Sequence, residues 1–177
     1  MADEAQRPNV VVVFTDDQGY GDLGCFRSPY IQTPNIDRMA GEECKFTSFN
    51  VGATVCTPSR AALMTGCYPS RVGLADGVLF EGADEGLHLD ERTIADVLGD
   101  AGYASTCIGK WHLGERDPFN PVNHGFDSYF GIPYSNDMGD QVDGGEYWHV
   151  PLMRGTEVVD DDVDQTTLTR RYTEEGV

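Results

Sequence analysis

The sequence predicts an α/β fold, in which strands and helices alternate along one chain. Three observations support this class: a run of β-branched residues near the start, amphipathic segments with helix-starting and helix-ending residues, and the alternation of these two patterns. The 177 residues suit one domain of ordinary size, and a hydrophobic content of 40% is enough to form a core. The sequence therefore favours one sheet-centred domain without internal repeats.

The first half of the chain supplies two predicted strands and two predicted helices. The run NVVVVFTDD, residues 9–17, is typical of a central strand that is buried on both faces. Residues 33–42 begin with a threonine and a proline before an apolar pattern, which predicts a short capped helix. Residues 44–51 alternate along the chain and predict a second strand. Residues 58–66 predict a helix that begins at a proline and ends at a glycine.

The second half contains one clear helix–strand pair and then a long loop-rich region. Residues 93–103 are amphipathic and predict a helix, and residues 104–114 predict a strand that leads into a loop. Residues 116–177 are rich in proline, glycine, asparagine and aspartate, so only short elements are expected there. Asp164 is a candidate N-cap for a last helix, which is expected to be truncated at the end of the chain.

The chain is strongly acidic, with 30 aspartate and glutamate residues against 12 lysine and arginine residues and a formal net charge of −18. This balance excludes nucleic-acid binding through a basic face. The acidic surface is either an adaptation to a high-salt cytoplasm, where salt screens its self-repulsion, or an ordinary property of an acidic mesophilic protein. Both explanations stay open on composition alone.

No segment of the sequence has the character of a membrane span or a signal peptide. The longest apolar run near the start, residues 10–14, is too short for either. The first ten residues, MADEAQRPNV, are polar and acidic, whereas a secretory n-region is positively charged. The chain as given is therefore expected to be cytoplasmic, or to come from a protein whose signal is missing from this sequence.

The five cysteines have irregular spacings, and no two of them form a C-x-x-C pair. Zinc-binding and thioredoxin-like functions are therefore disfavoured, and most of the cysteines are expected to be buried and inert. Cys56 stands out because it lies at a turn before a predicted helix. On the residues alone it is a buried small side chain, half of a disulfide, a thiolate nucleophile or the precursor of another group.

Two aspartates, Asp16 and Asp17, end the first predicted strand. The next segment, GYGDLG at residues 19–24, matches the dinucleotide-binding pattern G-x-G-x-x-G, but Pro29 and Pro34 exclude the helix that this pattern requires. The segment is instead expected to be an ordered loop at the end of the strand, where α/β sheets bind ligands. The two carboxylates are either ligands of a hard cation or solvated turn residues.

Four segments occur in a fixed order along the chain: FTDDQGYGDLG, CTPSRAALMTG, GKWHLG and GFDSYFGIPYSNDMGD. The second segment begins with Cys56, and the third contains Lys110 and His112. Together the four segments resemble the type I sulfatase family, and its formylglycine-dependent arylsulfatase branch in particular. The resemblance runs from about Pro8 to the last residue, and the combination is far more specific than any one segment.

The resemblance implies a fold and a domain organisation. The fold is an alkaline-phosphatase-like mixed sheet flanked by helices, which is incomplete in this chain. Residues 1–177 would be the N-terminal part of the sulfatase catalytic domain. Residues 8–115 would form the strand and helix core with the active-site motifs, and residues 116–177 the loop-rich segment. Because further family ligands lie beyond the last residue, this segment is expected to be inactive alone. Family members are often secreted, periplasmic or lysosomal.

The resemblance also implies a function for Cys56. In the family, a maturation enzyme reads the cysteine, proline and arginine of the motif, here Cys56, Pro58 and Arg60, and oxidises the cysteine to formylglycine. The aldehyde hydrates, and one hydroxyl attacks the sulfur of a sulfate ester and displaces the alcohol. The other hydroxyl then loses its proton and expels sulfate, which restores the aldehyde. A thiol or a serine lacks this second hydroxyl.

The implied metal site contains Asp16, Asp17 and the modified Cys56. Their oxygen atoms are ligands of the kind that Ca²⁺ prefers. The ion would orient the sulfate group and polarise the nucleophile. In the family, the remaining metal ligands come from a later part of the chain.

The implied sulfate-binding residues supply positive charge and hydrogen-bond donors, as a developing anion requires. Arg60 would hold the hydrated aldehyde, and Lys110 would bind a sulfate oxygen. His112 would contact the ester oxygen or transfer a proton. Ser135 matches a family position that contacts sulfate. The overall charge of −18 does not prevent anion binding, because salt screens distant exposed charges.

The family resemblance therefore predicts a sulfuric ester hydrolase that acts on a sulfate ester and depends on a maturation enzyme. Two alternatives stay open. One is a phosphate or phosphonate monoester hydrolase of the same superfamily. The other is a truncated remnant that keeps the fold but has no turnover.

Overall fold

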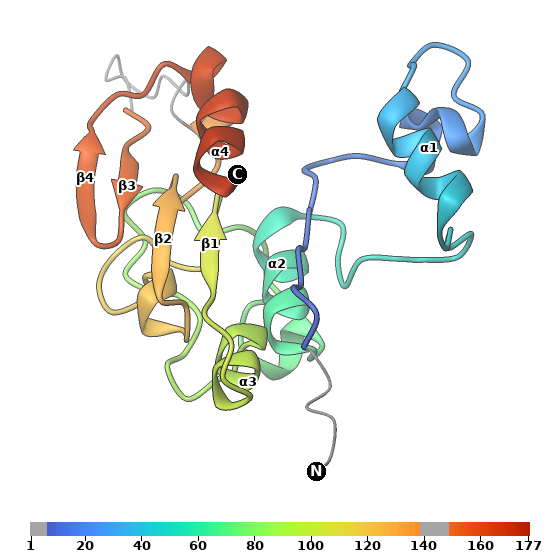
Figure 1. Cartoon of the computed structure of the whole chain (residues 1–177). Helices are drawn as coiled ribbons and strands as arrows, with labels where there is room; N and C mark the ends of the chain where they lie inside the picture. The colour runs from blue at the N-terminus through green and yellow to red at the C-terminus, as the bar shows by residue number, and fades with distance from the viewer. Residues whose placement is uncertain (1–6, 139–148) are drawn as a thin grey trace. The chain divides into compact units, whose positions relative to one another are not determined.

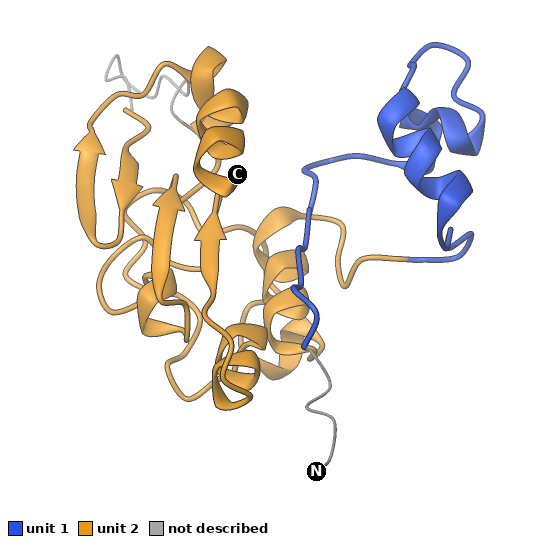
Figure 2. Cartoon of the chain, viewed as in Figure 1, with its two compact units in different colours: residues 1–49 blue, residues 50–177 orange. Residues whose placement is uncertain are grey.

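A computed structural model describes residues 7–138 and 149–177 of the chain. The chain forms two compact units, residues 1–49 and residues 50–177, which Figure 2 colours separately. All of the strands assigned within the described residues belong to the second unit. None of the helices in these described ranges is both long enough and apolar enough to span a membrane.

The first unit is built around one helix, α1 (Pro34–Glu42), which Figure 1 shows in light blue. It confirms the helix predicted for residues 33–42, with proline in its first turn. Thr33 is the residue before the helix, but its side chain does not cap the helix. Two short 3-10 turns precede the helix, η1 (Tyr20–Asp22) and η2 (Gly24–Phe26).

The glycine-rich segment of the first unit is an ordered loop, as predicted. Gly24 donates its backbone N–H to the hydroxyl of Thr33 at 2.9 Å, and Cys25 donates its N–H to a carboxylate oxygen of Asp37 at 2.6 Å. The Thr33 hydroxyl in turn donates to Asp37 at 2.8 Å. These bonds tie the loop to the start of α1, so the segment does not form the long helix of a dinucleotide-binding fold.

The strands predicted for residues 9–17 and 44–51 are wrong, because neither segment is assigned to a strand. Val11 is 85% exposed and Val13 is 84% exposed, although their β-branched side chains suit a buried strand. A central strand needs neighbours on both edges to bond its backbone N–H and C=O groups. The strands described in this chain pair only with one another, so both segments lack such neighbours here.

The second unit contains a mixed four-stranded sheet, which confirms the predicted α/β class and the mixed sheet (Figure 1). Its strands, in spatial order, are β1 (Thr106–Ile108), β2 (Ser128–Gly131), β3 (Leu152–Arg154) and β4 (Glu157–Asp160). The pair β1 and β2 is parallel, and the other two pairs are antiparallel. The strand predicted within residues 104–114 is thereby confirmed as β1.

Three helices accompany this sheet: α2 (Cys56–Thr65), α3 (Ile94–Asp100) and α4 (Leu168–Gly176). All three correspond to predicted helices, although α2 begins two residues before Pro58. It ends at Gly66, whose φ of 68° is a left-handed conformation that glycine adopts without strain. The predicted C-terminal stop of α2 is therefore confirmed.

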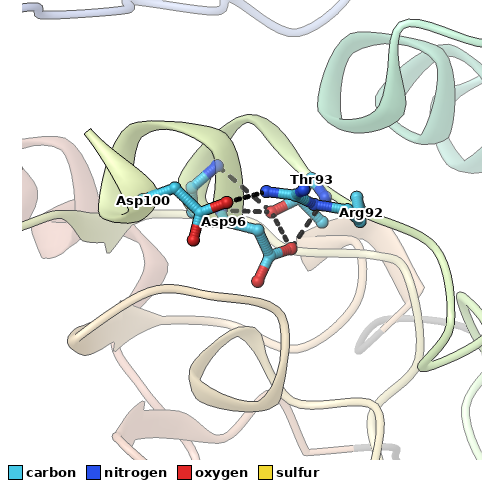
Figure 3. A network of polar contacts seen from close by, with 5 residues as sticks. Arg92, Thr93, Asp96 and Asp100 are labelled. Atoms are coloured by element: carbon cyan, nitrogen blue, oxygen red, sulfur yellow. Dashed lines mark hydrogen bonds and ion pairs between the residues drawn. The ribbon is translucent and has the colours of Figure 1, made fainter. Parts of the chain in front are cut away.

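The start of α3 is fixed by a reciprocal capping box (Figure 3). Thr93 accepts a hydrogen bond from the backbone N–H of Asp96 at 3.3 Å, and Asp96 accepts from the backbone N–H of Thr93 at 2.8 Å. The Thr93 hydroxyl also donates to the carbonyl of His124 at 2.7 Å, which ties the helix to a distant loop. Arg92 forms an ion pair with Asp100 across the outside of the same helix.

Asp164 caps a turn rather than α4 itself. Its carboxylate accepts the backbone N–H of Thr166 at 3.0 Å, within the 3-10 turn η6 (Gln165–Thr167) that leads into the helix. The predicted cap is thus confirmed one turn earlier than the α-helix. Residues 116–138 and 149–177 contain short strands and helical turns joined by loops, as the composition of this region predicts.

Two apolar clusters lie against the sheet. Tyr129 belongs to one cluster, together with Trp111 and Leu113, whereas its neighbour Phe130 belongs to the other, together with Leu152. Successive side chains of a strand point to opposite faces, so β2 places one residue in each cluster. Burial on both faces fixes the position of β2, and with it the loop that follows β2.

Candidate functional site

Cys56 is the first residue of α2 and is partly buried. It belongs to no disulfide. The preceding residue, Val55, has no side-chain oxygen, so it does not cap the backbone N–H groups of the first turn. These groups and the positive end of the helix dipole suit an anion beside residue 56.

The expectation that most cysteines are buried is wrong. Cys44 is exposed, and the other four are partly buried. Burial nevertheless raises the pKa of the Cys107 thiol to about 12, although Arg60 lowers it somewhat. Cys107 is therefore protonated at neutral pH and is no candidate for a thiolate nucleophile.

Arg60 lies one turn after Cys56 and connects α2 to the segment that follows β1. Its guanidinium donates a hydrogen bond of 2.6 Å to the carbonyl oxygen of Lys110. These two residues are 50 positions apart in the sequence. The bond fixes the segment of Lys110 beside the first turn of α2.

The segment after β1 is held by a continuation of the parallel pairing. Gly109 donates its backbone N–H to the carbonyl of Phe130 at 2.9 Å, and Trp111 donates to Ile132 at 3.0 Å. A Cβ atom on Gly131 would lie 1.8 Å from the Gly109 carbonyl oxygen, so only glycine permits this close approach. The pairing places residues 109–112 beside residues 130–133 at the carboxyl ends of two parallel strands, where α/β proteins bind ligands.

Lys110 and Ser135 meet at this edge of the sheet. The Lys110 ammonium group donates a hydrogen bond of 2.9 Å to the Ser135 hydroxyl. Ser135 is buried, and Lys110 is partly buried. A cationic donor and a hydroxyl group at this distance can bind two oxygen atoms of one tetrahedral anion.

His112 is buried, with 1% of its surface exposed, and has an unusual backbone conformation with φ of 60°. Its backbone N–H donates to the carbonyl of Pro133 at 3.0 Å, and its carbonyl accepts from the hydroxyl of Thr57 at 3.0 Å. The ring Nε2 atom lies 2.7 Å from the carbonyl oxygen of Leu79. Leu79 and Thr57 are partners that the sequence reasoning missed.

Asp16 and Asp17 belong to the first unit and are exposed. Asp17 has a φ of 55°, so it turns the chain at the end of the apolar run. Within the described parts of the chain, no group of three or more histidine, cysteine, aspartate or glutamate side chains is arranged to hold a metal ion. The metal assignment of Asp16, Asp17 and Cys56 therefore stays a prediction.

Two carboxylates that sequence reasoning missed, Glu81 and Glu115, lie in loops close in sequence to Leu79 and His112. Burial raises the pKa of Glu115, whose side chain is 16% exposed and accepts the backbone N–H of Gly82 at 2.7 Å. Burial and the neighbouring charge of Glu115 raise the pKa of Glu81. Burial likewise raises the pKa of Tyr134, which donates its hydroxyl to the carbonyl of His149 at 2.6 Å. No sequence motif marks Glu81 or Glu115.

Comparisons with known proteins identify relatives of this chain. The sulfatase family model matches residues 8–175. Human arylsulfatase A is 49% identical over 137 residues, which cover 76% of this chain and 27% of the relative. Rat arylsulfatase G is 40% identical over 202 aligned positions, which cover 98% of this chain and 37% of the relative.

Solved structures show the same fold. The structure described as Ps i-CgsB superposes with a TM-score of 0.80 at 29% identity and covers 97% of this chain and 42% of that protein. The PsFucS1 sulfatase from Pseudoalteromonas sp. gives a TM-score of 0.67 at 37% identity and covers 76% of this chain and 27% of that protein. The chain therefore spans less than half of these proteins, and its fold is the partial alkaline-phosphatase-like fold of the sulfatases. By its sequence and its fold, this chain belongs to the sulfatase family.

Proposed function

We propose that this chain is the N-terminal part of the catalytic domain of an enzyme that hydrolyses sulfate monoesters. The observation that carries the proposal is the contact between Lys110 and Ser135, at 2.9 Å, on the same segment that Arg60 holds beside the start of α2. These residues come from three separate segments of the chain. Their types suit the oxygen atoms of a sulfate group.

Lys110 and Ser135 are proposed to bind the sulfate group of the ester. The ammonium group acts as a point charge on one oxygen, and the serine hydroxyl donates to another once the anion replaces their mutual contact. Arg60 orients the nucleophile with its forked, permanently charged guanidinium group. His112 is proposed to carry a proton at the ester oxygen, which gains negative charge as the alcohol leaves.

Cys56 is proposed to be the precursor of formylglycine. The position fits this group, because Cys56 is partly accessible and stands at a helix N-terminus, one turn before Arg60. When formed, the hydrated aldehyde would supply two hydroxyl groups in place of one thiol. A separate maturation enzyme is required for this oxidation, and Cys56, Pro58 and Arg60 are the residues it is proposed to read.

Ca²⁺ is proposed as the metal of the complete site. The carboxylates of Asp16 and Asp17 are suited in kind to a hard cation, but they fall short of the roughly six to eight oxygen ligands that Ca²⁺ takes. The ion would supply positive charge that orients the sulfate group. Because the chain spans 27% and 37% of the length of its two relatives above, we propose that it does not turn over substrate alone.

A phosphate or phosphonate monoester hydrolase is the second candidate. The observation behind it is the same contact, because a lysine and a serine hydroxyl bind the oxygens of either tetrahedral anion. Rates on a matched pair of aryl sulfate and aryl phosphate esters, measured with a protein that contains the complete domain, decide between the two. Faster phosphate hydrolysis would refute the proposed sulfatase activity.

The direct test is the mass of the tryptic peptide that contains Cys56 after co-expression with a formylglycine-generating enzyme. Conversion removes two hydrogens and one sulfur and adds one oxygen, and an aldehyde-reactive hydrazide must label the product. The peptide that contains Cys67, another partly buried cysteine, is the internal control and must keep its thiol. An unmodified Cys56 under these conditions would overturn the proposed nucleophile.

A second assay tests whether the isolated chain is inactive. The purified and matured 177-residue chain is incubated with a chromogenic aryl sulfate, beside a Cys56→Ala variant. We expect no difference between the two. Turnover that disappears in the variant would show that the segment is active alone, while supporting the sulfatase chemistry itself.

A further inference from the structure

A closed set of hydrogen bonds joins three segments around His112. The Thr57 hydroxyl donates to the His112 carbonyl at 3.0 Å and accepts the backbone N–H of Leu79 at 3.1 Å. The Leu79 carbonyl in turn lies 2.7 Å from Nε2 of the His112 ring. The three residues are 22, 33 and 55 positions apart in sequence, so these bonds join α2, the loop at residue 79 and the segment after β1.

The three residues of this set are buried. Thr57 is completely buried, His112 is 1% exposed and Leu79 is 8% exposed. A buried hydroxyl group must use its donor and its acceptor within the protein, and Thr57 uses both here. Substitution by valine keeps the shape of the side chain but leaves the Leu79 N–H and the His112 carbonyl without this partner.

The backbone of His112 is held in a conformation that a residue with a Cβ atom rarely adopts. Its φ of 60° lies in the left-handed region. Such a conformation persists only where the surroundings impose it from several sides. Here the Thr57 hydroxyl donates to the His112 carbonyl, and the His112 backbone N–H donates to the Pro133 carbonyl at 3.0 Å.

The same set of bonds selects the tautomer of the ring. A carbonyl oxygen has no proton to give, so Nε2 of His112 is the donor in its bond to Leu79. The neutral ring therefore carries its proton on Nε2 and its lone pair on Nδ1. While the bond to Leu79 is intact, any proton that the ring takes up or releases passes through Nδ1.

We propose that Thr57 is a positioning residue for His112. Its hydroxyl keeps the backbone of His112 in the left-handed conformation, and it keeps Leu79 in place to hold the ring proton on Nε2. The consequence for catalysis rests on the proposed function: proton transfer in ester hydrolysis then occurs at Nδ1. Thr57 thus acts through His112 and does not itself contact the substrate.

The test is the ring-nitrogen NMR spectrum of His112 in the full 177-residue chain, at an alkaline pH where imidazole is neutral. Long-range ¹H–¹⁵N correlations tell which ring nitrogen carries the proton, and a His112→Gln variant assigns the signals. The wild-type chain is expected to show only the Nε2–H tautomer. An Nδ1–H tautomer in the wild-type chain would overturn the proposal without any variant.

Variants then separate positioning from general stability. Thr57→Ser keeps the hydroxyl and should keep the wild-type ring signals, whereas Thr57→Val should give a mixture of both tautomers. Thr65→Val is the matched control, because Thr65 also belongs to α2 but its hydroxyl bonds inside the helix, to the Ala61 carbonyl at 2.7 Å. It should leave the ring signals of His112 unchanged.

Two outcomes would refute the role of Thr57. One is an unchanged tautomer in Thr57→Val, and the other is an equal change in Thr65→Val, which would reveal a general effect of loosening α2. If Thr57→Val does not fold, loss of the Nε2–H tautomer in Thr57→Ser also refutes the role. None of these measurements requires turnover. Failure of the proposed sulfatase activity would therefore leave the test of Thr57 as a positioning residue intact.

Discussion

The two compact units differ in how well they bury the apolar residues that their sequences supply. The second unit buries Leu87, Leu113 and Leu152 completely, against a sheet whose strands all come from that unit. The first unit leaves Val11 and Val13 more than four-fifths exposed, although they belong to the most apolar run of the chain. An apolar pattern therefore becomes a strand only where partners for its backbone are also present.

The largest expected effect tests this difference directly. Leu113→Ala, in the second unit, removes a side chain with no exposed surface and should lower the free energy of unfolding by about 2–5 kcal/mol. Val11→Ala, in the first unit, should change it by about 0.5 kcal/mol or less. Urea unfolding followed by circular dichroism measures both. Equal losses would show that the apolar run of the first unit is buried in solution.

Two glycines sharpen the comparison, because the same substitution should have opposite effects. Gly131→Ala places a methyl group against the Gly109 carbonyl oxygen and should destabilise the second unit by about 1–3 kcal/mol. Gly41→Ala, in α1, meets nothing within 4 Å and should stabilise that helix by up to about 1 kcal/mol. Amide hydrogen exchange of β1 and of α1 reports the two effects separately. A stable Gly131→Ala chain with protected β1 amides would contradict the close approach of the two segments.

Each element could be predicted only as far as its signals are local in the sequence. The helices α2 and α3 could be predicted because each has its start signal, apolar pattern and stop signal within about a dozen residues, and α1 because a proline precedes its apolar pattern. The strands β2, β3 and β4 could not be placed individually, because three or four residues are too few to show a period. The strand predicted at residues 9–17 had the clearest pattern and still failed, because local sequence contains no information about absent neighbours.

The candidate site could be predicted only in part. The motif resemblance named Arg60, Lys110 and Ser135, and the structure brings these three into one connected set of hydrogen bonds. Thr57 was missed because a buried hydroxyl between two motif residues has no distinguishing pattern in sequence. Glu115 was missed for another reason: its burial results from the packing of its loop against Gly82, which is 33 positions away.

A smaller effect concerns stability in acid and compares a buried histidine of the second unit with an exposed one. The His124 ring is 1% exposed, and both of its nitrogens are without hydrogen-bond partners among the described residues. Burial lowers its pKa from 6.5, while Asp96 opposes the shift. The folded state thus binds fewer protons than the unfolded state, so stability should fall as the pH drops below about 6.5.

The test compares His124→Phe with the wild-type chain between pH 7.5 and pH 5. The phenylalanine ring can still pack against Trp111, whose centroid lies 5.7 Å from the imidazole, but it takes up no proton. The variant should therefore lose less stability on acidification. His88→Gln, at a side chain that is 70% exposed, is the control and should keep the wild-type pH dependence. An unchanged slope in His124→Phe would show that the buried ring does not control acid stability.

The smallest effect has the opposite sign with pH and comes from Glu115. Burial raises the pKa of this carboxyl above its ordinary value of 4.5, so the folded state favours the protonated form. The wild-type chain should therefore lose stability as the pH rises through the pKa of the folded state. Glu115→Gln keeps an oxygen acceptor for the Gly82 N–H and removes the charge, so its stability relative to wild type should increase from pH 4 to pH 7.

Glu85→Gln makes the same change of charge at an exposed position of a nearby loop and should not reproduce this dependence. Urea unfolding at both pH values measures all three chains. A Glu115→Gln chain that loses stability relative to wild type at pH 7 would mean that the carboxylate is held by favourable charges that outweigh its burial. In that event the hydrogen bond from the Gly82 N–H and the positive charge of Arg116, which both lower the pKa of Glu115, would outweigh the effect of its burial.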